Sequence, residues 1–334
     1  MIFDQLLQDL KKGNFQPLYV FHGEESYFID TLTRYIEQHA LPEEQRAFNQ
    51  TVLYGRDTDA KTLLDVAQRY PMMAERQVVI LKEAQEMKGL GDLKAYVEQP
   101  VETTILVIAH KNKKIPGNTA FGKAIKKKAT VLEAKPLYDN QIPGWIKAYL
   151  KTRKYSITEE ATALVAEYLG SDLSKVANEL DKLIINLPEG TEITPAQIEV
   201  QVGISKDYNV FELQKALGQR NPLKAQRIVQ YFAANPKRNP FIVVVSSLFN
   251  YFSKILMLHE LSRLPDKELA GKLGVNPYFL REYRAAARQY SRDQLEQIIH
   301  LLSEYDLKSK GVGYDTAGKP DGALLKELVW RIMN

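Results

Sequence analysis

The 334-residue chain contains no cysteine, so disulfides, thiolate metal sites and cysteine nucleophiles are excluded. Histidine is scarce too, and no two of the five histidines stand four residues apart as a helical metal-binding pair would: His22, His39, His110, His259 and His300. His22 and His110 end predicted parallel strands and could share a crevice, although single histidines are more often packed for structural reasons. No G-x-S-x-G motif occurs. We therefore expect neither a catalytic site nor a metal.

A signal peptide and a strong charge imbalance are also lacking. Residues 1–15 predict an amphipathic helix without the basic head and apolar run of a signal peptide. No later stretch is expected to span a bilayer, so we predict a cytoplasmic protein without a membrane partner. The net charge of +4 is too small to argue for nucleic-acid binding. Residues 110–130 do carry seven lysines and no acid, which suits a phosphate backbone, an acidic partner or simply a solvated helix face.

What is present is an ordinary globular composition, with 45% apolar and 26% charged residues. Within residues 1–138, five apolar segments alternate with helix-like ones, and the candidate strands are 17–23, 48–55, 76–82, 103–110 and 129–135. These strands lack polar alternation, which is typical of a parallel sheet covered by helices on both faces. We predict an open, wound α/β domain here.

After Pro136 the strand pattern stops. Residues 139–206 predict a small helical domain, whose last helix begins at Thr194 with Pro195 just inside it. Residues 207–334 predict a second all-α domain that contains the long apolar segment 241–261.

The first strand ends in a degenerate phosphate-binding corner. A P-loop has the pattern G-x-x-x-x-G-K-[ST] between its strand and helix, where amides and the lysine hold phosphate. Here Gly23 turns the chain, Glu24 and Glu25 would repel a triphosphate, and the last three positions of the pattern read Phe28, Ile29 and Asp30. The carboxylates also suit the positive end of a helix dipole, so this corner alone does not decide the function.

A second position indicates the same loss. NTPases usually end a neighbouring strand with an Asp-Glu pair that handles magnesium and water. The corresponding strand here ends in Lys82 and Glu83, which places a cation where a metal ligand belongs. Two independent losses favour a scaffold that does not hydrolyse nucleotide.

Five stretches, taken in order, resemble the delta subunit family of the bacterial DNA polymerase III clamp loader. They run PLYVFHGEESYFIDTLTRYI (17–36), RYPMMAERQVVILKEA (69–84), LGSDLSKVANELDKLIIN (169–186), VFELQKALGQRNPLKAQRIVQ (210–230) and LGVNPYFLREYRAAARQYSRDQLEQIIHLLSEYDLKSKG (273–311). Each motif is weak alone, but their order and spacing span nearly the whole chain.

The resemblance implies an AAA+-like first domain that neither binds nor hydrolyses ATP and needs no cofactor. It implies a subunit without a catalytic site of its own, within the polymerase III holoenzyme, a DNA-directed DNA polymerase and nucleotidyltransferase assembly of the replisome. The implied partners are the beta sliding clamp, the gamma/tau motor subunits, delta prime and primer–template DNA. The third domain would join a helical collar with the other subunits.

The resemblance also implies a clamp-binding pair of apolar side chains, which matches Met72 and Met73 after Tyr70 and Pro71. Pro71 follows a predicted helix over 59–70 and would place the pair on a protruding turn. Methionine side chains are flexible and polarizable, and so adapt to a pocket. The alternative is that both pack under the next strand.

Residues 307–320 are the candidate DNA contact. Lys308, Lys310 and Tyr314 combine charges for phosphate with a ring for base stacking, in a glycine-rich loop that would equally serve as a flexible connector.

Two other functions stay open from the residues alone. One is a P-loop-like NTPase or kinase with a degenerate loop. The other is an AAA+-derived DNA-binding regulator, because residues 266–290 mimic a helix-turn-helix with Arg281, Arg284 and Arg288 on its second helix.

Overall fold

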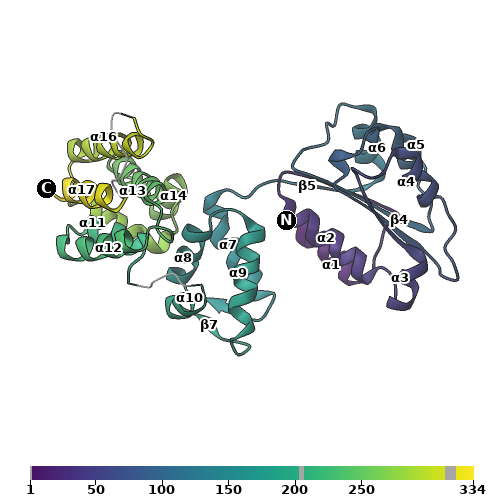
Figure 1. Cartoon of the computed structure of the whole chain (residues 1–334), viewed down its shortest axis with the longest axis horizontal. Helices are drawn as coiled ribbons and strands as arrows, with labels where there is room; N and C mark the ends of the chain where they lie inside the picture. The colour runs from purple at the N-terminus through teal and green to yellow at the C-terminus, as the bar shows by residue number, and fades with distance from the viewer. Residues whose placement is uncertain (1, 203–206, 313–320) are drawn as a thin grey trace. The chain divides into compact units, whose positions relative to one another are not determined.

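The computed structural model describes residues 2–202, 207–312 and 321–334. The chain divides into two compact units, Met1–Leu137 and Tyr138–Asn334, which are described separately (Figure 1). The boundaries of the three predicted domains stay predictions.

The first unit is built on a five-stranded sheet in the order β2-β3-β4-β1-β5, with every neighbouring pair parallel. The strands are β1 (Leu18–Gly23), β2 (Gln50–Tyr54), β3 (Gln77–Lys82), β4 (Thr104–Lys111) and β5 (Thr130–Ala134). In the central strands β1 and β4 nearly every residue is buried, as expected for a sheet with helices on both faces. The predicted α/β architecture with a parallel sheet is confirmed, and the AAA+-like assignment of this domain stays a prediction.

Helices cover the two faces of this sheet (Figure 1). One face carries α1 and α2, and the opposite face carries α4, α5 and α6 over a core of alternate strand residues such as Val20, Val79 and Ile108. The helices are α1 (Ile2–Lys11), α2 (Ser26–His39), α3 (Glu43–Asn49), α4 (Ala60–Ala67), α5 (Lys94–Glu98) and α6 (Ala120–Lys128), with single 3₁₀ turns at Ala84–Glu86 and Leu90–Leu93.

The predicted strand over 48–55 was wrong at its start. Phe48 and Asn49 end helix α3, and the strand begins at Gln50. A seven-residue helix that runs directly into a strand offers too few turns for its period to show in the sequence.

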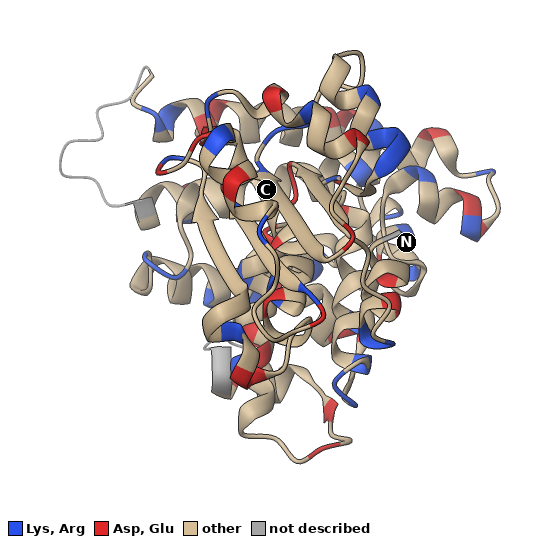
Figure 2. Ribbon diagram, turned by 90° about the vertical axis from the view of Figure 1, so that its right-hand side faces the viewer, with Lys and Arg blue, Asp and Glu red and all other residues tan. Residues whose placement is uncertain are grey.

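The lysine-rich run 110–130 is divided among different roles. Lys111 is mostly buried, and Lys114 pairs with Glu133 at 2.9 Å. On α6 the apolar residues Phe121 and Ile125 face the core while its four lysines are exposed. Basic and acidic residues are interspersed over most of the ribbon (Figure 2). The exposed lysines of α6 are compatible with a solvated helix face, a phosphate backbone or an acidic partner, so these alternatives stay open.

His22 and His110 are neighbours in register on β1 and β4, and both are buried. The Ile115 amide donates to His22 Nδ1 at 3.3 Å, and His110 Nδ1 lies 3.0 Å from the Lys113 carbonyl oxygen. Burial is the main cause that lowers the pKa of both imidazoles below the ordinary value of 6.5. At His22, Glu133 acts in the opposite direction, but the positive charge of Lys114 and the neighbouring His110 add to the lowering, so the pKa stays below 6.5. Both histidines are packed near the carboxyl ends of two central strands.

Stability should therefore depend on pH. Because both pKa values are lower in the folded protein, the unfolded chain binds more protons than the folded chain near and below pH 6.5. The contribution of the two neutral histidines to stability is therefore fully present only above that pH. The free energy of unfolding should decline as the pH falls from there toward the lower folded-state values. Urea unfolding between about pH 5 and pH 8 measures this slope. His22→Gln should flatten the slope and the exposed His39→Gln should not; an equal slope in all three proteins would contradict the assignment.

The second unit begins with a helical module that contains a minimal sheet. Strands β6 (Ser156–Ile157) and β7 (Glu192–Ile193) pair in parallel, so the expectation that strands stop after Pro136 was wrong in this detail. Two-residue strands are too short to show a period. The helices are α7 (Ile142–Lys151), α8 (Glu159–Leu169), α9 (Leu173–Ile185) and α10 (Pro195–Val202), preceded by a 3₁₀ turn at Asp139–Gln141.

The remaining elements are helical. They are α11 (Val210–Gly218), α12 (Pro222–Ala234), α13 (Phe241–Leu261), α14 (Asp266–Leu273), α15 (Leu280–Ala287), α16 (Arg292–Ser309) and α17 (Asp321–Met333), with a 3₁₀ turn at Pro277–Phe279. Polar N-cap side chains accept the first free amides of several helices in this unit: Thr158, Asp172, Asn209, Asn221 and Ser291.

The expectation that no stretch is long and apolar enough to span a bilayer was wrong for helix α13, which meets that criterion by length and composition. Half of its apolar window is buried, and Val244, Leu248, Phe252 and Ile255 pack in the core of this unit, with α13 in contact with α16 and α15. This burial is typical of the central helix of a globular domain.

Candidate functional site

The phosphate corner of the sheet is closed by main-chain hydrogen bonds. The amide of Gly23 donates to the Lys113 carbonyl oxygen at 3.1 Å. The amides of Glu24 and Glu25 both donate to the Ala134 carbonyl oxygen on β5, at 2.9 and 3.2 Å. In a P-loop, amides at this corner point at phosphate. Here they already have acceptors.

The side chains of the corner are equally unsuited to phosphate. Ile29, at the position of the P-loop lysine, is fully buried, and Phe28 packs against Phe3 with ring centroids 4.6 Å apart. Glu25 caps α2 by accepting the Tyr27 amide at 3.0 Å. Glu25, Phe28 and Ile29 thus have structural roles in starting or packing this helix.

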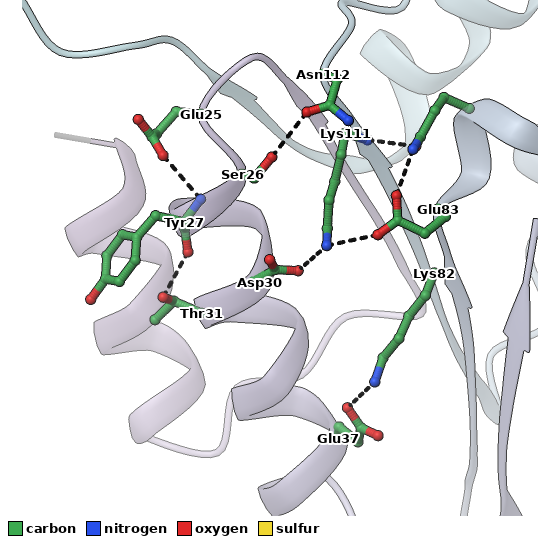
Figure 3. Close-up of polar contacts among 11 residues, drawn as sticks. Glu25, Ser26, Tyr27, Asp30, Thr31, Glu37, Lys82, Glu83, Lys111 and Asn112 are labelled. Atoms are coloured by element: carbon green, nitrogen blue, oxygen red, sulfur yellow. Dashed lines mark hydrogen bonds and ion pairs between the residues drawn. The ribbon is translucent and has the colours of Figure 1, made fainter. Parts of the chain in front are cut away.

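An ion-pair network fills the space between α2 and the ends of β3 and β4 (Figure 3). Lys111 Nζ lies 2.7 Å from Asp30 Oδ1 and 2.8 Å from Glu83 Oε1, so one cation bridges two carboxylates. Lys82 points to a different partner, Glu37 on α2, at 2.8 Å. Lys111 therefore pairs with the residue at the Ser/Thr position of the P-loop pattern, Asp30, and with the residue at the acidic position after β3, Glu83.

The pKa values agree with this pairing. Burial alone would lower the pKa of Lys111, but its hydrogen bonds to Asp30 and Glu83 outweigh burial and raise it. Burial would raise the pKa of Glu83, but hydrogen bonds from Lys111 and Gln85 lower it. Both groups are held in their charged forms.

These residues do not fit a bound ATP–magnesium complex. The amides are taken, the lysine position is apolar, and the carboxylates at the Ser/Thr and acidic positions are bound to Lys111. Among the described residues, no group of three or more His, Asp or Glu side chains could hold a metal ion.

We accordingly expect no measurable ATP binding. Isothermal titration with ATP and magnesium should give only the heat of dilution, because binding would require breaking the Lys111 network and the main-chain bonds of the corner. Saturable binding that depends on magnesium would contradict this and favour the degenerate NTPase or kinase.

The second candidate region is the segment after α4, here called the Met loop and defined as residues 68–76. Helix α4 ends at Ala67 rather than running to Tyr70 as predicted. Gln77 explains the early end, because its Nε2 donates to the carbonyl oxygens of Val66 and Arg69 at 3.2 and 2.7 Å and bends the chain away from the helix axis. Pro71 then follows in a chain that has already turned.

The Met loop presents its apolar side chains to solvent. Tyr70, Met72 and Met73 are 89%, 62% and 101% exposed, while Pro71 is half-buried. Met73 has a φ of 52°, in the left-handed region that is uncommon for residues other than glycine. These side chains are not part of the core of the N-terminal unit, which removes the alternative that the methionines pack under the next strand.

A second buried side chain fixes the Met loop at Met72. Asn49, at the end of α3, accepts the Met72 amide at 2.6 Å and donates to the Met72 carbonyl oxygen at 3.0 Å. Sequence reasoning missed this residue because it was assigned to a strand.

The candidate DNA-binding residues are only partly described. Lys308 pairs with Glu304 at 2.7 Å and lies over the Tyr305 ring, and Lys310 pairs with Asp306 at 2.6 Å. Tyr314 lies outside the described residues. Contact of these residues with DNA stays a prediction.

The segment that mimics a helix-turn-helix does form two short helices, α14 and α15, with Gly274 in the left-handed conformation between them. Arg284 pairs with Asp266 at 2.6 Å, whereas Arg281 and Arg288 are exposed. Leu269, Leu273 and Leu280 close a small core with Leu258 of α13, so this pair of helices has a packing role.

Comparisons with known proteins agree on one family. The family model "DNA polymerase III, delta subunit" matches residues 19–135, and a second model, for the C-terminal domain of that family, matches residues 207–318. The chain is 27% identical to DNA polymerase III subunit delta of Bacillus subtilis over 340 residues, covering 98% of this chain and 95% of that protein.

A solved structure extends this likeness to the fold. The Bacillus subtilis DNA clamp loader delta protein is similar with a TM-score of 0.57 and 26% identity, over 100% of this chain and 99% of that one. The RuvB Holliday junction branch migration motor of Thermotoga maritima is similar at 13% identity over 86% of each chain, with a TM-score of 0.39. On the two family models and the full-length match, the chain belongs to the DNA polymerase III delta subunit family.

Proposed function

We propose that this protein is the non-catalytic clamp-loader subunit that binds the beta sliding clamp through Met72 and Met73 and favours its open form. The observation that carries the proposal is the exposed methionine pair on a loop whose base is hydrogen-bonded to the domain. In a member of the delta subunit family, this is the position at which the sequence predicts the clamp contact.

The chemistry of the Met loop suits a pocket on a protein. Two adjacent thioether side chains contribute apolar area without a charge to desolvate, and they adapt to the shape of the pocket. Tyr70, also exposed, adds a ring with a polar end at the rim of the same segment. Pro71, which is half-buried, lies between Tyr70 and the methionine pair.

The closed phosphate corner supports a subunit that leaves ATP hydrolysis to others. Its amides and carboxylates are bonded to other groups of the N-terminal unit, so this unit would serve as a scaffold that carries the Met loop. The nucleotide chemistry would come from the gamma/tau motor subunits, which would assemble with this chain and delta prime around primer–template DNA in the cytoplasm. ATP on those subunits would control whether the Met loop is accessible.

Opening a ring requires no bond chemistry from this chain. A protein that binds the open or strained clamp interface more tightly than the closed one shifts the population toward the open form. The shift is limited by the difference between the two affinities.

The test compares clamp rings with a free interface and rings whose interface is locked by a covalent crosslink. We expect binding to the free ring and at least about fivefold weaker binding to the locked ring, measured by titration with the purified chain. Equal affinity for both rings would contradict the opening mechanism, and no binding to either would contradict the clamp contact.

A further inference from the structure

Asn49 makes an unusual pair of contacts for a buried amide side chain. It is only 4% exposed, at the junction where α3 passes into β2. Its Oδ1 accepts the Met72 amide at 2.6 Å and its Nδ2 donates to the Met72 carbonyl oxygen at 3.0 Å. The same Nδ2 lies 3.3 Å from the Gln45 carbonyl oxygen within α3. One side chain therefore satisfies both main-chain groups of a single loop residue.

The residue held in this way lies within the proposed contact. With both main-chain groups of Met72 hydrogen-bonded, the backbone that carries its side chain is held in one conformation. Met73 needs this support, because a positive φ is costly for methionine and persists only where neighbouring contacts impose it. Both side chains are nevertheless exposed, so the hydrogen bonds order the backbone while leaving the apolar groups accessible.

The attachment of Met72 is separate from that of the end of helix α4. The end of α4 is bound by Gln77 and by Thr104, whose hydroxyl donates to the Ala67 carbonyl oxygen at 2.8 Å. Those contacts hold residues 66–69, whereas Asn49 holds the main chain of Met72. A substitution at Asn49 therefore removes the hydrogen bonds to Met72 and leaves those of Gln77 and Thr104 to the end of α4 in place.

We infer that Asn49 is a positioning residue that pre-organises Met72 and Met73 for an apolar pocket on a protein partner. The inference rests on the proposed function, since the partner would be the sliding clamp. A loop already held in its binding conformation loses less conformational freedom on association, and this raises affinity without any contact between Asn49 and the partner.

The test has a structural arm and a binding arm. In the free protein, hydrogen exchange at the Met72 amide should be slow in the wild type and at least about tenfold faster in Asn49→Ala, because its acceptor is removed. Clamp affinity should fall about tenfold. Asn49→Asp keeps an acceptor for the amide but places a buried carboxylate oxygen beside the Met72 and Gln45 carbonyl oxygens, so its affinity should also fall.

Two controls separate positioning from general stability. Ile108→Val, a buried change on β4, lowers the stability of the same unit without touching the Met loop and should leave clamp affinity unchanged. In a Met73→Ala background, Asn49→Ala should cost less affinity than in the wild type, because both act through the same side chains.

The outcomes distinguish the two proposals. If the wild type does not bind the clamp, the proposed function fails, while the exchange arm still reports on the Asn49 contact. If the wild type binds, the inference is overturned by an unchanged affinity in both Asn49 variants, by unchanged exchange at Met72, or by an equal loss in Ile108→Val. If Asn49→Ala does not fold, exchange at the Met72 amide and clamp affinity are measured on Asn49→Asp instead.

Discussion

Replacing Met72 and Met73 together with alanine is expected to lower affinity for the sliding clamp by at least about tenfold while thermal stability barely changes. Burying two methionine side chains contributes roughly 3–6 kcal/mol before the costs of association, at about 1.5–3 kcal/mol for each. Because both side chains are exposed in the free chain, their removal leaves no cavity in the fold.

The measurement is a clamp titration paired with a thermal melt of each variant. Leu223→Ala serves as a matched control, since Leu223 is also a large exposed apolar residue (70%) but belongs to α12 in the other unit. A large fall in the melting temperature of the double variant, together with the loss of affinity, would show that the methionines stabilise the fold. A normal affinity in the double variant would place the contact elsewhere.

The second large effect concerns the closed phosphate corner, where Gly23→Ala should destabilise the N-terminal unit by more than about 3 kcal/mol. Gly23 has a φ of 133°, and a Cβ there would lie 2.1 Å from the Ala134 carbonyl oxygen. That oxygen is the acceptor for the Glu24 and Glu25 amides, so the clash cannot be relieved without breaking these bonds.

Urea unfolding measures this loss, with Gly117→Ala as the control. Gly117 lies in the same unit, and a Cβ there would meet nothing within 4 Å. A Gly23→Ala protein as stable as the control would mean that the corner relaxes easily, and would weaken the argument that its amides are committed to β5.

The sheet was predictable because its strands are unbroken apolar runs. Segments such as 76–82 and 103–110 have no polar alternation, so their burial on both faces and their parallel pairing follow from composition and spacing. The short elements were not predictable, since α3 and the two-residue strands β6 and β7 do not complete enough periods.

The candidate site was only partly predictable for a different reason. The resemblance to the delta subunit family pointed to Met72 and Met73, whereas the residues alone left packing under the next strand open. The absence of a P-loop lysine is visible in the sequence. The contacts of Asn49 with Met72, and of Lys111 with Asp30, join residues that are far apart in the chain. A single sequence does not show which distant polar groups the topology brings together.

Site-specific photocrosslinking from position 73 tests the central claim most directly. A diazirine-bearing aliphatic residue in place of Met73, illuminated in a mixture with the sliding clamp, should give a crosslink to residues lining an apolar pocket of the clamp, and an excess of the unmodified chain should suppress it. Crosslinks confined to the chain's own N-terminal unit, with the clamp present at saturating concentration, would contradict the account.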